Sequence, residues 1–147
     1  MTIRTIAETD RAEWRRMRDA LWPGSPADHE NETHDYFERA APPFTVFIAA
    51  DGGQVVGFLE FDYRSYAPGC ASSPVPFVEG WYVDPDHRGR GIGAALMKAA
   101  EDAARAAGYH EIASDTDIDN ASAIAAHRAL GYQETDRVIS FRKPLTR

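Results

Sequence analysis

The sequence predicts a mixed fold, α/β or α+β, with a central sheet and flanking helices. Runs of β-branched and aromatic residues alternate with runs whose apolar residues recur at helical spacing. Asp51-Gly52-Gly53 separates two strand-like runs, 44–50 and 54–64, and such a turn predicts an antiparallel hairpin. Residues 77–116 read as strand, helix and strand, which predicts one parallel βαβ crossover. These three observations define the fold class.

The N-terminal part begins with a predicted strand and two predicted helices. Residues 2–8 alternate enough for a strand. Asp10 and Glu13 have the spacing of a capping box, and the residues that follow predict a helix reaching Leu21. In the second helix, over 24–40, Ser25 is the expected N-cap and Pro26 the first helical residue.

The remaining elements follow from turn residues and apolar runs. They are a loop over 65–76, a strand over 77–84 stopped by Pro85, a helix over 93–107 ended by Gly108, a strand over 111–116, a helix over 120–130 capped by Asn120 or Ser122, and a last strand over 137–143.

Length and composition exclude several classes. A chain of 147 residues suits one domain, 1–147, and its net charge of −7 disfavours nucleic acid as a partner. No run is long and apolar enough for a membrane span, and the N-terminus lacks the core of a signal peptide, so we expect a cytoplasmic protein. Cys70 is the single cysteine and the histidines have no metal-ligand spacing, so we expect no metal.

The loop "RGRGIG", residues 88–93, has the chemistry of an anion site. Glycines let a ligand approach the backbone, and a helix that begins here presents unpaired N–H groups to a phosphate. The Walker and dinucleotide patterns both fail, because no Lys-Ser/Thr follows and the glycine spacing is wrong. Taken alone, the loop favours the interpretation of an ordinary glycine-rich turn with solvated arginines.

The wider sequence resembles the GCN5-related N-acetyltransferases (GNAT). "VDPDHRGRGIGAALM" matches their pyrophosphate motif, and "NASAIAAHRALGYQET" resembles a second family signature downstream. The resemblance implies a GNAT fold: a twisted, mostly antiparallel sheet flanked by helices, with a splayed strand pair as the acetyl-CoA cleft. It also implies direct acetyl transfer from acetyl-CoA to an amine.

The resemblance further implies which residues hold acetyl-CoA. The backbone of strand 77–84 would bind the pantetheine arm, and the loop with the start of its helix would bind the pyrophosphate. Asn120 matches an asparagine that contacts the CoA arm, although a plain helix N-cap also explains it. The expected set is Trp81, Tyr82, Val83, Arg88, Gly89, Arg90, Gly91, Ile92, Gly93, Ala94 and Asn120.

An amine acceptor calls for carboxylates that bind a cation and remove a proton. Glu79 interrupts the apolar run of a strand expected to be central, where an unpaired charge is costly. Asp115 ends the next strand, at the edge where α/β sheets commonly bind ligands. We expect Glu79 to be the base, acting through water, with Asp115 as the alternative.

Longer stretches are similar to bacterial aminoglycoside 6′-N-acetyltransferases, among them "VEGWYVDPDHRGRGIG" and "HRALGYQETDRVISFRKPL". The resemblance implies a polycationic antibiotic as substrate, resistance as the outcome, and a site lined by Trp22, Tyr66, Glu79, Asp115 and Asp136. Trp22 also reads as a residue closing the core, and Tyr66 as an exposed loop residue. The resemblance implies a homodimer, for which 54–64, 65–76 and 137–143 are candidate interface segments.

One residue departs from the family pattern. His127 stands where the family often has a tyrosine that protonates the leaving thiolate. His127 could be that acid, the thiolate could leave without one, or His127 could simply pack in its helix. Three other functions compete with the first: acetylation of a polyamine or metabolite, acetylation of protein tails, and non-catalytic CoA binding.

Overall fold

A five-stranded sheet forms the centre of the computed structural model, which describes residues 1–146. The strands lie in the order β1-β2-β3-β4-β5. The first three pairings are antiparallel, and β4 and β5 are parallel. The strands are β1 (Thr2–Thr5), β2 (Thr45–Asp51), β3 (Gln54–Arg64), β4 (Val75–Val83) and β5 (Ala113–Ser114). The prediction of a mixed, mostly antiparallel sheet is confirmed.

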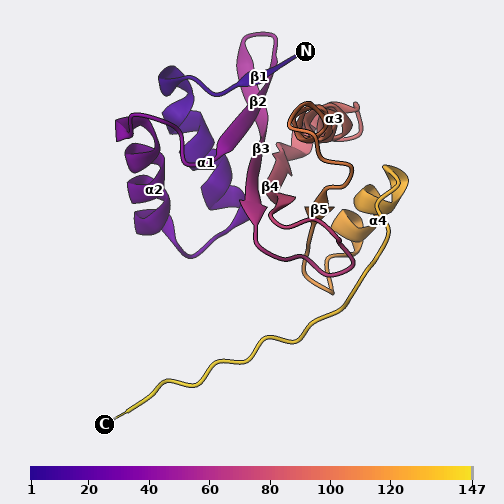
Figure 1. The fold of residues 1–147 in the computed structure, drawn as a ribbon. Helices are drawn as coiled ribbons and strands as arrows, with labels where there is room; N and C mark the ends of the chain where they lie inside the picture. Colours follow the sequence, from indigo (N-terminus) through magenta and orange to yellow (C-terminus); the bar gives the residue numbers. More distant parts are fainter. Residues whose placement is uncertain (147) are drawn as a thin grey trace.

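Helices cover both faces of this sheet (Figure 1). The helices are α1 (Arg11–Leu21), α2 (Pro26–Glu38), α3 (Ile92–Ala106) and α4 (Ala121–Ala129), with short 3-10 turns at Glu8–Asp10 and Pro85–His87. Helices α1 and α2 lie together on one side, and α3 lies on the other (Figure 1). None of the described helices is long and apolar enough to cross a membrane.

Two apolar clusters hold the layers together. On one face, Leu96 and Met97 of α3 are fully buried against Leu59 and Val78 of the sheet. On the other, Trp14 of α1 packs with Phe58 and with aromatic side chains of α2. The burial of these large side chains fixes the middle of the sheet, and with it the strand that carries Glu79.

The predicted hairpin and crossover are both present. Gly52 and Gly53 have φ of 58° and 83°, as a tight turn between two strands requires. Strand β4, helix α3 and strand β5 form the parallel crossover, and α3 ends before Gly108, whose φ is 90°. Strand β5 is much shorter than the predicted 111–116, because only Phe77 and Val78 of β4 pair with it.

The predicted side-chain caps of the first two helices are wrong. The Asp10 carboxylate accepts hydrogen bonds from the Arg4 guanidinium at 2.6 Å and from the Ala7 N–H at 2.8 Å. It therefore makes no capping bond to the first turn of α1. Glu13 binds Arg16 and not the helix end. The Ser25 side chain makes no capping bond either, although Pro26 is indeed the first residue of α2.

The predicted last strand over 137–143 is also wrong for the isolated chain. After α4 the described chain leaves the body as an extended arm with no neighbouring strand (Figure 1). A strand needs a partner for its N–H and C=O groups, and the arm has none within residues 1–146. Val138, Ile139, Phe141 and Leu145 are exposed on it by 71%, 80%, 91% and 90%.

Candidate active site

The site begins where β4 and β5 separate. The two strands pair only at Phe77 with Ala113 and at Val78 with Ser114. The next residues, Glu79 on β4 and Asp115 after β5, no longer pair across the two strands. The predicted splayed strand pair is therefore present. It places two carboxylate-bearing residues at the opening between the strands.

The glycine-rich loop leads directly into α3. Gly89 and Gly91 have φ of 77° and 82°, values that favour glycine, and a Cβ added at either would meet nothing within 4 Å. Gly91 is the N-cap of α3, and no side chain of residues 1–146 caps this helix end. Open backbone beside a helix N-terminus is a geometry that can accept a phosphate group, so the pyrophosphate site stays a prediction for this loop.

Trp81 and Gly93 hold this helix end against β4. The Trp81 Nε1 donates a hydrogen bond to the Gly93 carbonyl at 3.0 Å. A Cβ added to Gly93 would lie 3.2 Å from the Trp81 ring, so a glycine lets helix and ring approach closely. Sequence reasoning expected only the backbone of Trp81 to contribute, whereas its side chain positions the start of α3.

Arg88 turns back onto β4. Its Nε donates to the Val83 carbonyl at 2.8 Å, and its guanidinium lies 5.6 Å from the centre of the Tyr82 ring. The carbonyl of Val83 is therefore already bonded, although Val83 was expected to bind the pantetheine arm. Arg90 is exposed beside the open glycines and is free to approach a phosphate.

Glu79 is paired with an arginine that sequence reasoning missed. Arg64 donates to Glu79 from Nε at 2.9 Å and from Nη2 at 2.6 Å. Its Nη1 lies 3.8 Å from the Asp115 carboxylate. The structure therefore brings Glu79 and Asp115 together around one guanidinium. Strand register decides this contact, and no local sequence signal marks it.

Trp22 lies beside the same opening. The end of its ring occupies the place of a side chain at Gly80, where an added Cβ would lie 2.6 Å from Cη2. Trp22 also packs edge-on against Phe58, and the Arg18 guanidinium carbon lies 5.2 Å from its ring centre. Trp22 closes the core and remains partly exposed against Gly80 of β4, so both of its predicted roles are compatible with its position.

A buried ion pair lies behind Trp22. Arg18 Nε lies 2.9 Å from Glu60 Oε2, and Trp14 Nε1 donates to the same carboxylate at 3.1 Å. Burial raises the pKa of Glu60 to about 7, and the charge of Arg18 opposes this shift only in part. Glu32 reaches Arg18 from α2 at 2.7 Å. This cluster was not found from the sequence.

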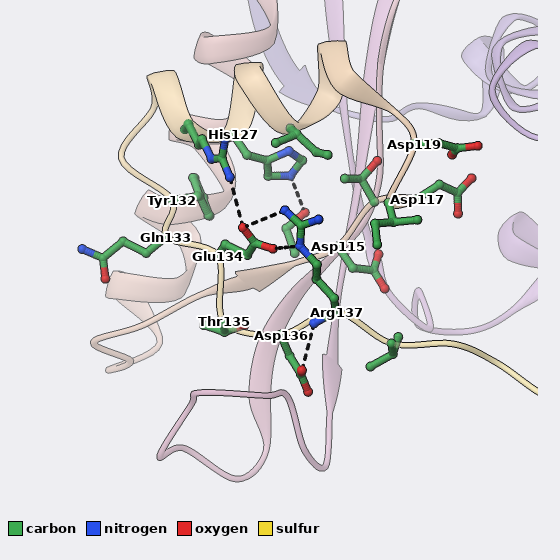
Figure 2. A pocket seen from close by; sticks show the side chains of 16 residues that line it. Asp115, Asp117, Asp119, His127, Tyr132, Gln133, Glu134, Thr135, Asp136 and Arg137 are labelled. Carbon is green, nitrogen blue, oxygen red and sulfur yellow. Dashed lines mark hydrogen bonds and ion pairs between the residues drawn. The ribbon is translucent and has the colours of Figure 1, made fainter.

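Asp115 and Asp136 line one open pocket of about 490 Å³ between β5, α4 and the base of the arm (Figure 2). Glu134 lies across this pocket, where it bonds Arg128 at 3.0 Å and also Arg137. Trp22, Tyr66 and Glu79 are not among the residues that line it. Tyr66 is 71% exposed on the loop before β4, as its alternative reading expected.

His127 is held at both ring nitrogens. Nδ1 lies 2.7 Å from the Ala123 carbonyl, which can only accept, so Nδ1 carries a proton. Nε2 lies 2.8 Å from the Ser114 hydroxyl, at the last paired residue of β5. In the neutral ring Nε2 therefore accepts from Ser114 and has no proton to give. The ring also meets Trp81 edge-on, with centroids 5.1 Å apart.

Asn120 caps α4. Its side chain accepts from the Ala123 N–H at 3.1 Å, so the capping alternative is confirmed. Within residues 1–146, no group of three or more His, Cys, Asp and Glu side chains is arranged to hold a metal ion.

Comparisons with known proteins agree with this geometry. Residues 14–132 match the model of the acetyltransferase (GNAT) family. The chain is 44% identical to an aminoglycoside N(6′)-acetyltransferase type 1 of Klebsiella aerogenes, over 97% of this chain and 96% of that protein. It is 43% identical to a protein of the same name from Stenotrophomonas maltophilia, over 98% and 94% of the two chains.

Solved structures give the same result. An apo aminoglycoside 6′-N-acetyltransferase from Acinetobacter haemolyticus superposes with a TM-score of 0.88 at 35% identity, covering 99% of this chain and all 100% of the other. The enzyme AAC(6′)-Iy, bound to the bisubstrate analogue CoA-S-monomethyl-acetylneamine, superposes with a TM-score of 0.87 at 38% identity, over 98% of each chain. Together with the splayed strands and the glycine loop, these matches show that the chain belongs to the GNAT family and is an acetyl-CoA-dependent N-acetyltransferase.

Proposed function

We propose that this single-domain enzyme acetylates the 6′-amine of aminoglycoside antibiotics and so confers resistance to them. The observation that carries the proposal is the opening between β4 and β5. A glycine-rich loop with open backbone follows β4, and the Glu79 and Asp115 carboxylates both lie within reach of Arg64 at the opening. An anionic co-substrate and a cationic acceptor can therefore approach each other there. The relatives, named for the same reaction, supply the regiochemistry.

The open backbone of Gly89 and Gly91 and the N-terminus of α3 would hold the pyrophosphate of acetyl-CoA. Backbone groups of β4 that β5 leaves unpaired would hold the pantetheine arm, and Asn120 would contact it from α4. Acetyl-CoA supplies an activated acetyl group. An N–H of β4 aimed at its carbonyl would stabilise the negative charge that develops on that oxygen.

The acceptor side uses charge and a base. Glu79 and Asp115 would bind ammonium groups, with Asp136 at the rim of the adjoining pocket and Trp22 and Tyr66 presenting aromatic faces to the sugar rings. Glu79 would take a proton from the 6′-ammonium through water, because an amine attacks only when unprotonated. Both ring nitrogens of His127 already have partners, the Ala123 carbonyl and the Ser114 hydroxyl, so the thiolate would leave without direct protonation by that residue.

The enzyme would act as a homodimer in the cytoplasm, where acetyl-CoA is available. The exposed apolar arm after α4 supports the dimer, since a second copy of the chain offers it a complementary sheet edge. Thr135 anchors the base of this arm against Gly69 of the 65–76 loop. Sedimentation of the full chain should give a dimer, and a chain ending at residue 136 should sediment as a monomer. A monomeric full chain would contradict this assignment.

Thiol release from acetyl-CoA tests the reaction. Tobramycin and kanamycin carry a 6′-amine, paromomycin carries a 6′-hydroxyl, and spermidine is a polyamine without sugar rings. Rapid turnover of the first two and none of paromomycin is the expected result. Turnover of spermidine alone would keep the enzyme class and remove the antibiotic assignment. If nothing in the panel is turned over while CoA still binds, the catalytic proposal is wrong.

A further inference from the structure

Arg64 lies against both carboxylates proposed to bind the acceptor, Glu79 and Asp115. It is the last residue of β3, and its guanidinium carbon lies 3.6 Å from the centre of the Phe77 ring. From there it reaches both oxygens of Glu79, at 2.9 Å and 2.6 Å, and lies 3.8 Å from Asp115. The cation–π contact and the bidentate pair hold the guanidinium over the opening between β4 and β5.

We propose that Arg64 is an internal counter-cation of the acceptor site, which an incoming acceptor must displace from Glu79. The inference rests on the proposed function, because it takes Glu79 and Asp115 as the ammonium-binding carboxylates. The two carboxylates alone carry a charge of −2. Together with the Arg64 guanidinium, the cluster carries a net charge of −1. An acceptor therefore meets a site whose charge is already half balanced.

This arrangement selects for highly charged acceptors. The Arg64–Glu79 pair is partly exposed, with side-chain exposures of 42% and 30%, so water can solvate the guanidinium once it leaves. Exposed pairs of this kind contribute little to stability, so displacement is feasible. An amine with a single charge merely replaces one cation by another at Glu79. A polycation has further charges for Asp115, which Arg64 reaches only at 3.8 Å, and for Asp136, with which Arg64 forms no ion pair.

The chain offers a matched control. Arg105 on α3 is 67% exposed and bonds Asp102 at 3.0 Å, so Arg105→Gln removes the same charge from an exposed pair outside the site. Arg64→Lys keeps the charge of the natural residue but loses its two-pronged hydrogen bonding. Any effect of lowering the overall charge will appear in Arg105→Gln as well.

The experiment measures the Kd for tobramycin by calorimetry, with CoA bound, for the natural chain and for the Arg64→Gln, Arg64→Lys and Arg105→Gln variants. Arg64→Gln should bind tobramycin about 10-fold more tightly, as expected when one competing cation is removed from a partly exposed site. Arg64→Lys should fall between, and Arg105→Gln should match the natural chain.

The opposite result would show that Arg64 positions Glu79. In that case Arg64→Gln would bind tobramycin more weakly, or would lower kcat with an unchanged Kd. Failure of the proposed function is read separately, from the natural chain alone. If that chain binds tobramycin without acetylating it, the reaction is wrong while the displacement test still stands. If it does not bind tobramycin, both proposals are overturned.

Discussion

Two arginine–glutamate pairs lie close together in this molecule and differ mainly in their contact with water. Arg18 and Glu60 have side-chain exposures of 7% and 5%, whereas Arg64 and Glu79 have 42% and 30%. Glu60 pairs across the strands with Gly80, the residue after Glu79, so the two carboxylates are neighbours in the sheet. The same chemistry is therefore present once inside the protein and once at its opening.

Burial decides what each pair can do. Arg18 and Glu60 are buried, so water cannot replace a lost partner and each charge requires the other. Trp14 donates a further hydrogen bond to Glu60, and Glu32 forms a second ion pair with Arg18. Arg64 and Glu79 can exchange each other for water or for a charged ligand at little cost. The buried pair therefore supports the wall behind Trp22, and the exposed pair is available for binding and catalysis.

The largest expected effect is on folding, at the buried pair. Glu60→Ala leaves the Arg18 guanidinium buried with Glu32 as its remaining partner and opens a cavity beside Trp14. We expect the free energy of unfolding to fall by about 3 to 5 kcal/mol, measured by urea denaturation. The double variant Arg18→Met/Glu60→Leu, which removes both charges, should recover most of that loss. Equal destabilisation in both variants would mean that packing, and not the unpaired charge, dominates.

At the exposed pair the expected effect is on catalysis. Glu79→Gln keeps the shape of the side chain but removes the proposed base, so kcat/KM for tobramycin should fall by about 100-fold or more. The free energy of unfolding should change by less than about 1 kcal/mol, because the pair with Arg64 is partly exposed. Enzyme assays and urea denaturation on the same preparation give both values. A large loss of stability with little loss of activity would reverse the assignment of the two pairs.

The contrast between the pairs also shows what the sequence could predict. Local signals were sufficient for the hairpin at Gly52-Gly53, for the crossover around α3 and for the open glycine loop, because each depends on residues near one another in the chain. Glu79 was recognised because a charge interrupts an apolar run. The expected acetyl-CoA site and acceptor residues came from the resemblance to a family, and they stay predictions.

Contacts that depend on register could not be predicted. Arg64 reaches Glu79 from a neighbouring strand, and a one-residue change of register would turn its side chain to the other face. The predicted capping box at Asp10 is wrong because Arg4, six residues earlier on β1, binds the Asp10 carboxylate in place of the helix end. The strand expected over 137–143 failed for another reason, since the described chain contains no partner for it.

The buried pair should also respond to pH in a direction fixed by Glu60. The folded protein raises the pKa of this carboxyl from 4.5 to about 7, so between these values the folded state retains a proton that the unfolded chain has lost. The contribution of Glu60 to stability is therefore complete below about pH 4.5 and declines as the pH rises toward 7, by roughly 1 kcal/mol per pH unit.

Glu60→Gln cannot titrate and lacks this slope. The difference in unfolding free energy between the variant and the natural chain should therefore shift in favour of the variant as the pH rises from about 5 to about 8. Urea denaturation of both proteins at each pH measures how this difference in unfolding free energy changes with pH. A constant difference in stability between the two proteins does not affect that change. A difference that stays constant over this range would mean that Arg18 keeps Glu60 ionised in the folded state.

The smallest expected effect is the coupling between Arg64 and Glu79. A double-mutant cycle with Arg64→Gln and Glu79→Gln, measured on the free energy of unfolding, gives the interaction free energy of the pair. We expect it to be about 1 kcal/mol or less and to shrink further in about 1 M salt. Both properties follow from partial exposure, since water and salt screen the two charges. A coupling of about 3 kcal/mol that ignored salt would place this pair in the same class as Arg18 and Glu60. Arg64 would then be too firmly held for an acceptor to displace, and the difference between the two pairs would lie in position alone.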